Sequence, residues 1–322
     1  MKPHVHTVRL SVLFLCFVFY SKTSFSQAIT FANGKYELGL GIGPIHFLGD
    51  LGGGVGRGTK FVKDLDIPLT KLNKGLYLNY YPTEWLGLRL AGNLGYVEGD
   101  DNQAPAKGGA EEDRKYRNLS FHSKISEVYA GVELYPTVFF EKYDGLLGKI
   151  RPFVVGGVGV YHFDPYTKGA NGKDVRLQPL SLEGQGFPQY PDSKPYKLTQ
   201  MNMLLGVGFK YYIKENFYVG LELLHRKLFT DYIDDVSKDS YVDPIHFDAN
   251  LSSTQAVLAR SLYYRGTYTS AASNPGDSRY SPQVAQRGDP SENDAFFSSI
   301  LRLGWRLGGD AIGKQLKCPV FY

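Results

Sequence analysis

The stretch that decides the fold is Trp85 to Val97, WLGLRLAGNLGYV, in which apolar residues recur at every second position. One face of an extended strand would carry Leu86, Leu88, Leu90, Leu94 and Tyr96, and the other would carry Arg89, Ala91 and Asn93. Successive side chains of a strand point to opposite faces, so this alternation predicts one apolar and one polar face. Such a strand is typical of a membrane barrel, in which lipid meets one face and the lumen meets the other.

Seven further stretches bring the expected number of strands to about eight, although the sequence leaves the facing of residues 151–163 open. They lie near residues 36–45, 72–81, 118–135, 151–163, 197–212, 217–223 and 294–307. Tilted strands of about ten residues are long enough to cross a bilayer. We therefore expect an all-β fold, an eight-stranded antiparallel transmembrane β-barrel of OmpA-like size.

The connections between these strands are short and long in turn. Short turns follow 72–81 and 197–212, whereas long polar connections follow 36–45, 85–97, 151–163 and 217–223. Outer-membrane barrels have short periplasmic turns and long extracellular loops, so both ends of the chain should be periplasmic. The connection 136–150 is long for a periplasmic turn and could extend a strand or dock a periplasmic partner. Its apolar residues are Phe139, Phe140, Leu146 and Leu147.

The face opposite the apolar one carries charges, which separates this pattern from a soluble barrel or sandwich. A soluble barrel turns its polar residues outward and its apolar residues inward. Here the charges fall on the face that would line the lumen, at Glu37, Arg89, Glu127, Glu133, Lys210, Glu222, Arg226, Arg302 and Arg306. Buried charges must pair or face water, and eight strands leave an interior just filled by side chains. We expect a lumen plugged by a charge network and no open pore.

The N-terminal segment predicts export. Residues 1–26 combine basic residues, the apolar run Leu10–Tyr20 and small polar residues, as in a secretory signal peptide cleaved after Ser26. A membrane-anchoring helix is the alternative, but it would need about 20 apolar residues. A leucine rather than a small residue precedes Cys16, so we expect no lipidation there. The expected organisation is a signal peptide at 1–26, an outer-membrane barrel at 27–307 and a periplasmic tail at 308–322.

Charge and motifs exclude several function classes. The net charge is +4 and the basic residues are dispersed among acidic ones, so we expect no nucleic-acid partner. The glycine-rich run Gly49–Gly58 lacks the Gly-Lys-Ser/Thr ending of a phosphate loop and is better interpreted as an external loop. His225 and His246 could serve a rim-sited enzyme, but the chain has no nucleophile elbow and no histidine pair at metal-ligand spacing. We expect no enzyme, no cofactor and no catalytic or metal site.

Two features leave alternatives open. The first is an acidic cluster of Asp231, Asp234, Asp235, Asp239 and Asp243, which could bind calcium or could form turns, caps and salt bridges. Its spacing does not match an EF-hand loop. The second is Cys318, the one cysteine left after removal of the signal peptide. It could form an intermolecular disulfide or remain an inert thiol.

Several strings resemble a known family. They are Arg117–Phe121 (RNLSF), Arg151–Val154 (RPFV), Leu177–Leu180 (LQPL), Glu183–Gly186 (EGQG), Phe229–Ser237 (FTDYIDDVS), Gln286–Pro290 (QRGDP) and the terminal Cys318-Pro319. Together they resemble the PorG-like outer-membrane barrels of Bacteroidota, over nearly the whole mature chain. The strings are more specific than strand alternation alone.

The resemblance implies an eight-stranded barrel in the outer membrane without catalytic residues. It also implies an accessory role in the type IX secretion machinery, beside a periplasmic ring built from a lipoprotein and its partner. The expected partners are outer-membrane lipid and periplasmic or outer-membrane proteins of that machinery, with contacts through 136–150 and the tail. The alternative is a surface binding or adhesion barrel that acts through its long loops.

Overall fold

The computed structural model describes residues 36–52, 68–104, 111–139, 150–214, 216–266 and 285–307. These residues belong to one compact unit that spans 32–322. The expected signal peptide, its cleavage point and the expected tail lie outside the described residues.

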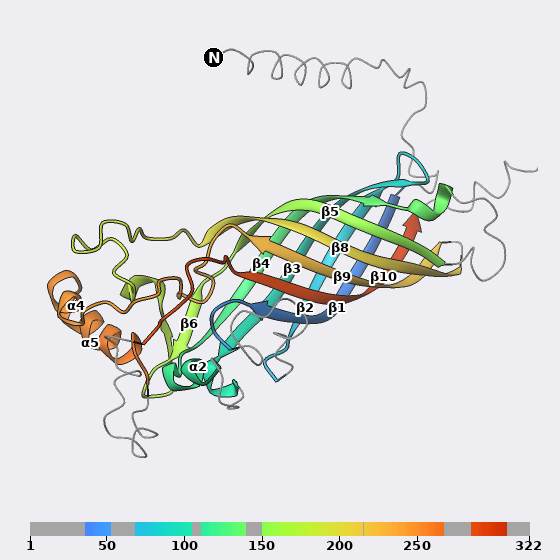
Figure 1. Ribbon diagram of the computed structural model, residues 1–322. Helices are drawn as coiled ribbons and strands as arrows, with labels where there is room; N and C mark the ends of the chain where they lie inside the picture. The colour runs from blue at the N-terminus through green and yellow to red at the C-terminus, as the bar shows by residue number, and fades with distance from the viewer. Residues whose placement is uncertain are drawn as a thin grey trace, which may run out of the picture. The chain divides into compact units, whose positions relative to one another are not determined.

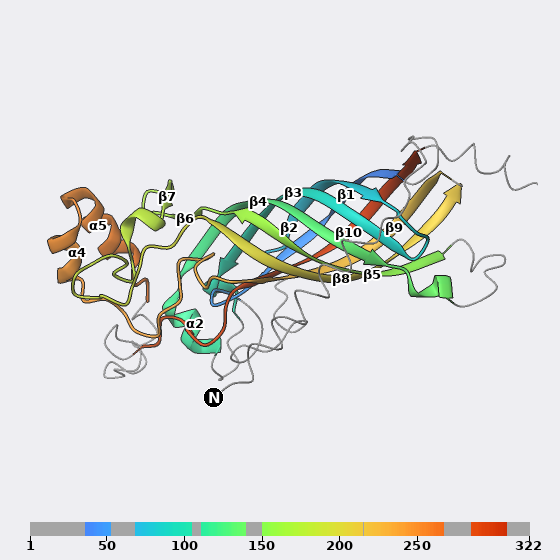
Figure 2. The same cartoon turned by 90° about the horizontal axis from the view of Figure 1, so that it is seen from above.

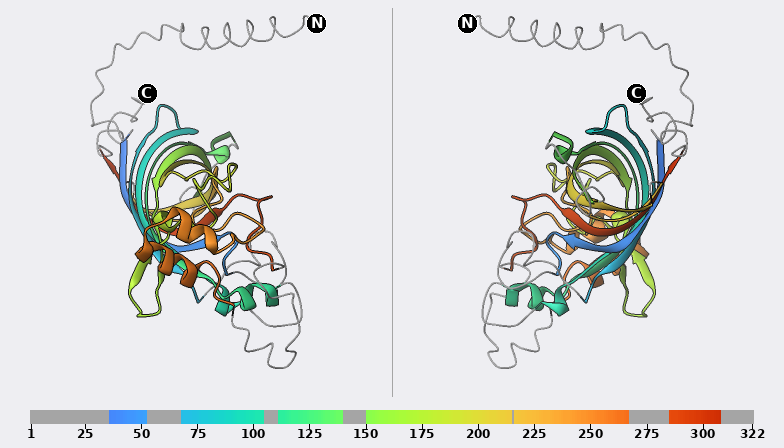
Figure 3. Two further views of the ribbon diagram at one scale, coloured as in Figure 1. Left: turned by 90° about the vertical axis from the view of Figure 1, so that its left-hand side faces the viewer. Right: turned by 90° about the vertical axis from the view of Figure 1, so that its right-hand side faces the viewer.

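Eight antiparallel strands close into a barrel, which confirms the expected fold class. They are β1 (Tyr36–Leu48), β2 (Lys71–Tyr80), β3 (Leu86–Asp100), β4 (Ser120–Leu134), β5 (Ile150–His162), β8 (Thr199–Lys214), β9 (Phe217–Leu228) and β10 (Ala295–Leu307). Neighbours pair in the order β3-β2-β1-β10-β9-β8-β5-β4, and a β3–β4 pairing closes the ring (Figures 1 and 3). Closure leaves the eight barrel strands without an open edge, which a barrel in lipid requires.

The outer face of the barrel is an apolar band. On β3, Leu88 and Leu90 are 44% and 55% exposed, whereas Arg89 between them is 2% exposed. The same pattern recurs around the wall, with Leu205 on β8 reaching 65% exposure. A closed sheet with its leucines outside and its charges inside is suited to lipid rather than to water.

The two ends of the barrel differ. The turn end holds the first residues of β1 and the last of β10, together with the turns after β2, β4 and β8. Outward aromatic rings gather there: the ring centroids of Tyr36 and Tyr80 are 5.1 Å apart, and those of Phe217 and Trp305 are 5.2 Å apart. Aromatic girdles of this kind mark the edge of a membrane-spanning band. The opposite end, where β1, β3, β5 and β9 lead into long connections, is the loop end.

The long connections fold into a cap at the loop end instead of remaining open loops (Figures 1 and 2). We define the cap as the described residues of 49–52, 101–119, 163–198, 229–266 and 285–294. Its elements are η2 (Asp101–Gln103), α2 (Glu111–Arg117), β6 (Pro165–Lys168), β7 (Asp174–Arg176), η4 (Gln178–Leu180), α4 (Ile245–Asn250) and α5 (Ser253–Leu262). The short hairpin β6–β7 continues the barrel sheet, because Tyr166 on β6 pairs with His122 on β4.

One apolar core joins the cap to the upper lumen. Phe247 of α4 and Ile233 are 0% exposed and belong to the same cluster as Val97, Phe121 and Tyr161 of the barrel wall. The N-cap of α5 is Ser252, whose hydroxyl accepts a hydrogen bond from the backbone N–H of Gln255. No described helix is long and apolar enough to cross a membrane.

Candidate functional site

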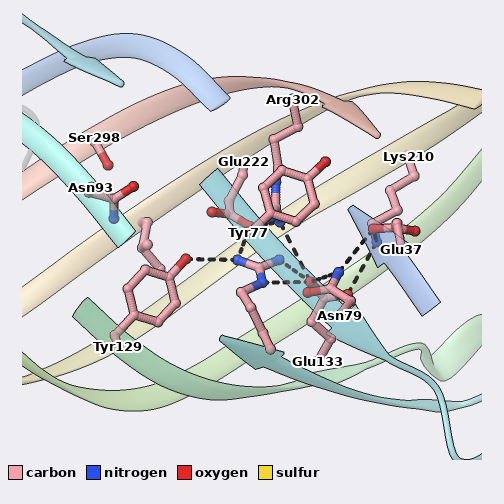
Figure 4. A network of polar contacts seen from close by, with 12 residues as sticks. Glu37, Tyr77, Asn79, Asn93, Tyr129, Glu133, Lys210, Glu222, Ser298 and Arg302 are labelled. Atoms are coloured by element: carbon pink, nitrogen blue, oxygen red, sulfur yellow. Dashed lines mark hydrogen bonds and ion pairs between the residues drawn. The ribbon is translucent and has the colours of Figure 1, made fainter. Parts of the chain in front are cut away.

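The middle of the lumen holds a network of charges, drawn in Figure 4. Four cations and four carboxylates are at most 2% exposed there: Arg89, Lys210, Arg226 and Arg302 with Glu37, Glu127, Glu133 and Glu222. Figure 4 labels Glu37, Glu133, Lys210, Glu222 and Arg302 among them. Strand alternation places them all inside, since each stands at the inward parity of its strand.

Arg89 is the centre of this network. Its Nε donates to Glu133 Oε1 at 2.7 Å, and Nη1 donates to Glu222 Oε2 at 2.6 Å. Arg302 donates to the same Glu222 oxygen at 2.7 Å, and its guanidinium lies 3.5 Å from the centroid of the Tyr77 ring. Two arginines and two glutamates therefore hold four strands together across the lumen.

Lys210 closes the network toward the turn end. Its ammonium donates to Glu37 at 2.8 Å and to the Tyr81 hydroxyl at 2.6 Å. Glu37 also accepts a hydrogen bond of 2.6 Å from Tyr218, and Asn79 bridges Glu37 and Glu133 at 2.9 Å each. Each of these buried charged side chains contacts at least one side chain of opposite charge, as a buried ion requires.

A second pair stands nearer the loop end. The Arg226 Nε lies 3.1 Å from both oxygens of Glu127, and its Nη1 donates to the Ser298 hydroxyl at 2.5 Å. Asn93 and Asn202 donate to the remaining lone pairs of Glu127 at 2.8 Å and 2.7 Å. The amides complete the solvation that water would otherwise supply.

Glycines make room for the tyrosines that line the network. A Cβ on Gly39 would overlap the Tyr77 side chain, and one on Gly304 would overlap Tyr218. The two tyrosine hydroxyls meet at 2.6 Å. Filled in this way, the lumen is a plug of side chains.

Arg306 stands apart from the rest of the predicted network. It is only half-buried, and it donates from Nη2 to the Tyr212 hydroxyl at 3.0 Å. Within the described part of the chain it forms no ion pair with a carboxylate. It lines the turn-end mouth, with its guanidinium 5.1 Å from the Tyr212 ring centroid.

The cap contains a second polar core, built around two buried arginines. Arg117 donates from Nε to Asp101 at 2.8 Å and from Nη2 to the Asp50 carbonyl at 2.6 Å. Arg287 donates from Nε to Glu183 at 2.9 Å, and Arg117 donates to the Arg287 carbonyl. We call these residues, with the buried Asp231, Asp234, Asp235 and Asp294, the cap polar core.

Backbone groups rather than cations satisfy much of its negative charge. Asp234 accepts from the N–H groups of Leu51 at 3.2 Å and Val236 at 2.9 Å. Asp294 accepts from the N–H of Ile233 at 2.8 Å, while its Oδ1 has no hydrogen-bond partner within the described chain. These contacts tie the loop after β9 to the connections that enter β10 and leave β1.

Burial raises the pKa of several of these carboxyl groups. Desolvation, with the neighbouring charge of Asp50, raises the pKa of Asp231 to about 9. Desolvation raises the pKa of Asp235 to about 7 and that of Asp50 to about 6. The pKa values of Asp234 and Asp294 are raised well above the ordinary range by burial and by the other carboxylates. The cap therefore favours protonated carboxyl groups at neutral pH.

Five of the seven strings that carried the family resemblance lie in or beside this cap, whereas Arg151–Val154 stands at the turn end of β5 and Cys318-Pro319 lies outside the described residues. Arg117 and Glu183 begin two of them, Asp231–Ser237 belongs to the longest, and Arg287 lies in QRGDP. The Glu183 carboxylate accepts from Arg287 Nε and from the N–H of Ser237 at 2.9 Å each. Sequence reasoning did not place these segments together, because no periodicity links loops so far apart in the chain.

The structure does not assemble the catalytic constellation that the sequence left open. His225 points outward from β9, and His246 Nδ1 lies 3.0 Å from the Tyr190 hydroxyl. Asp243 accepts from the N–H of Ile245 at the start of α4, and Asp239 is exposed. No group of three or more His, Cys, Asp or Glu side chains in the described ranges could hold a metal ion.

The candidates for partner contact fall mostly on residues that the structure does not describe. Phe139 ends the 3-10 turn η3 (Pro136–Phe139) at the turn end and is 67% exposed, 6.0 Å from the Trp85 ring. Phe140, Leu146, Leu147 and Cys318 lie outside the described residues.

Comparisons with solved structures find similar chains at low sequence identity, among them outer-membrane proteins. No family model matches the sequence, and no curated protein matches it. A major outer membrane protein from Thermus thermophilus is 13% identical, with a TM-score of 0.36 over 84% of this chain and 98% of that chain. OprG from Pseudomonas aeruginosa is 11% identical, with a TM-score of 0.36 over 84% and 94%. Ail, the attachment invasion locus protein of Yersinia pestis, solved with a heparin analogue, is 8% identical, with a TM-score of 0.33 over 84% and 98%.

Proposed function

We propose that this chain is a non-enzymatic outer-membrane barrel that anchors or organises a protein secretion assembly, the type IX machinery with its periplasmic ring. The observation that carries the proposal is the plugged lumen. Paired charges and tyrosines fill the barrel between Glu37 and Glu127, so the wall and the two ends remain for function. The choice of the type IX machinery rests on the resemblance of the family strings, most of which lie in or beside the cap.

The proposal includes an orientation. The apolar band spans the outer membrane, the cap faces the cell exterior, and the turn end with both chain ends faces the periplasm, after cleavage near Ser26. Long connections on one side and short turns on the other support this placement. Phe139 and the rest of 136–150 then face the periplasmic ring, as does the tail with Cys318.

Affinity purification tests the proposal. A tagged full-length chain, extracted in mild detergent, should recover proteins of a periplasmic ring, and deletion of the gene should impair secretion of that machinery's cargo. The double variant Phe139→Ser/Phe140→Ser should recover less of the ring, whereas Lys173→Gln on the β6–β7 turn should not. Recovery of no ring protein, with secretion intact in the deletion strain, would sink the proposal.

A second candidate function is surface binding by the cap. The observation that favours it is the exposed apolar pair Ile245 and Val257, which are 64% and 59% exposed on α4 and α5. Deleting residues 252–289 would not test surface binding cleanly, because the deletion would also remove the buried Arg287 and the buried face of α5 and so disrupt the cap. The variant Ile245→Asn/Val257→Asn keeps the cap intact. Loss of cell-surface binding with unchanged secretion would favour this function over the first.

A further inference from the structure

The outer wall changes character near the loop end on four neighbouring strands. On β9 the outward residues Leu221 and Leu223 are followed by His225 and the exposed Lys227. On β4 the outward Val128 is followed by Ser126 and the exposed Lys124. On β5 and β8 the last outward residues are His162 and Thr199, both exposed. We call Lys124, His162, Thr199, His225 and Lys227 the basic arc.

The strand register orders the arc residues across four neighbouring strands. Lys227 is opposite Met203 of β8, and Thr199 at the end of β8 is opposite His162 of β5. His162 is in turn opposite Ser126 of β4, two residues from Lys124. Figure 1 shows these strands side by side. His162 Nδ1 and Thr199 Oγ1 lie 3.0 Å apart, which fixes the imidazole between the two lysines.

The arc lies where the headgroups of a bilayer would be. Lys227 follows Phe217, at the aromatic turn end of β9, by ten residues. Ten residues of a strand tilted by about 40° rise roughly 25 Å, the height of the apolar band in barrels of this type. The lysine stems therefore rest on the apolar band with their ammonium groups at its edge.

Charge at this level is unbalanced. Lys124 and Lys227 have no ion-pair partner in the described ranges, whereas Lys71 pairs with Glu98 at 2.7 Å and Lys168 with Asp174 at 2.6 Å. The outward residues of β4, β5, β8 and β9 include no carboxylate. On the opposite wall, the outward loop-end residues of β10 include no lysine or arginine. An exposed outward lysine, Lys74, also stands on β2. What distinguishes the basic arc is therefore the absence of outward carboxylates on its four strands.

We propose that the basic arc binds the phosphate groups of a phosphorylated glycolipid in the leaflet at the loop end. This inference rests on the proposed placement in the outer membrane. Two ammonium groups above an apolar wall match a headgroup that carries phosphate above acyl chains, and charge-assisted hydrogen bonds to phosphate are the strong kind. The acyl chains lie along the outward methionines and valines of β8 and β5.

The test compares lipids that differ only in phosphate. The purified full-length protein in detergent is mixed with bis-phosphorylated lipid A or with the same lipid after phosphatase treatment, and bound lipid is measured by native mass spectrometry. Wild type should retain the phosphorylated lipid at least tenfold better. Lys124→Gln/Lys227→Gln should lose that preference, and the exposed control Lys173→Gln should keep it. Excess inorganic phosphate should not displace the lipid, since the acyl contacts are part of the site.

Three results would overturn the inference. They are equal retention of both lipids by wild type, an unchanged preference in the double lysine variant, and displacement of the lipid by free phosphate. Heat-modifiability on gels verifies that each variant retains its barrel. The proposed secretion role is tested separately, because it would be contradicted by the absence of ring proteins from the pull-down. The double lysine variant should recover the ring proteins as wild type does, because both lysines lie at the loop end.

Discussion

The lumen and the cap both bury charge, but they balance it in different ways. In the lumen, four cations face four carboxylates in direct contact. In the described part of the cap polar core, two buried arginines serve six buried carboxyl groups, which are Asp101, Glu183, Asp231, Asp234, Asp235 and Asp294. The lumen is neutral by ion pairing, whereas the cap depends on backbone N–H donors and on protons. The barrel should therefore tolerate changes of pH that the cap does not.

The largest effect should follow from removal of a lumen cation. Arg89→Met leaves Glu133 and Glu222 buried with fewer partners, which typically costs about 3–5 kcal/mol. Urea titration of the protein refolded into lipid vesicles would measure this loss. The neighbouring outward substitution Leu90→Met is the matched control and should cost less than about 1.5 kcal/mol. Equal stabilities of the two variants would mean that the network is not what holds the barrel closed.

Adding Glu222→Gln to Arg89→Met sharpens the same test. The second change removes the charge of Glu222, one of the carboxylates that lose a partner in Arg89→Met, so the double variant should lose less stability than the sum of the two single losses. Strict additivity would contradict a coupled network.

In the cap, loss of one arginine should be severe but local. Arg287→Gln removes the cation that pairs with Glu183, and we expect the cap to open at a cost of about 3 kcal/mol while the barrel persists. Limited proteolysis should then cut within residues 229–266, whereas heat-modifiability on gels stays normal. Resistance to protease equal to wild type would show that backbone donors alone hold the cap.

The contrast also explains what could be read from the sequence. Strands have a period of two, so Arg89 between Leu88 and Leu90 already fixes the inner and outer faces of β3, and such patterns mark the other strands as well. The facing of β5 stayed open, because valines and glycines occupy both of its faces. The tyrosines and asparagines that complete the network, such as Tyr218 and Asn79, stand at the same inward parity and could have been added by that rule.

The cap offered no such rule. Arg287 and Glu183 are 104 residues apart, and their contact depends on how several aperiodic connections fold together. One local signal was available: Ala256, Ala259 and Leu262, at helical spacing after the N-cap Ser252, mark the buried side of α5. The short β6–β7 hairpin had no equivalent signal, because its strands span only four and three residues.

Stability measured over a series of pH values should distinguish the cap from the barrel, with a smaller effect than the arginine substitutions. Asp231, Asp235 and Asp50 have pKa values of about 9, 7 and 6 in the folded cap, against an ordinary value of 3.8. The folded cap then binds more protons than the unfolded cap between pH 4 and 9. The stability that these three carboxyl groups contribute is full below pH 4 and is lost as the pH rises toward 9.

Hydrogen exchange, corrected for intrinsic rates, would measure this as protection of residues 229–237. We expect protection to fall about tenfold or more between pH 5 and 9, while β8 and β9 change little. Asp231→Asn removes one of the acids and should flatten the slope. A slope that is as steep in this variant, or a barrel that follows the cap, would contradict the contrast between the two regions.

The smallest effect concerns the two sides of α5. Val257 is 59% exposed, so Val257→Asn should change cap stability by no more than about 0.5 kcal/mol. Ala259, two residues later, is 0% exposed against the cap core, and Ala259→Asn should open the cap to protease. If Val257→Asn were as destabilising as Ala259→Asn, a partner would have to cover Val257 in the assembled protein. If Val257→Asn exposed the cap to protease in vesicles that contain only the purified protein, the partner would be a second copy of the chain. If it did so only in native membranes, the partner would be a different protein.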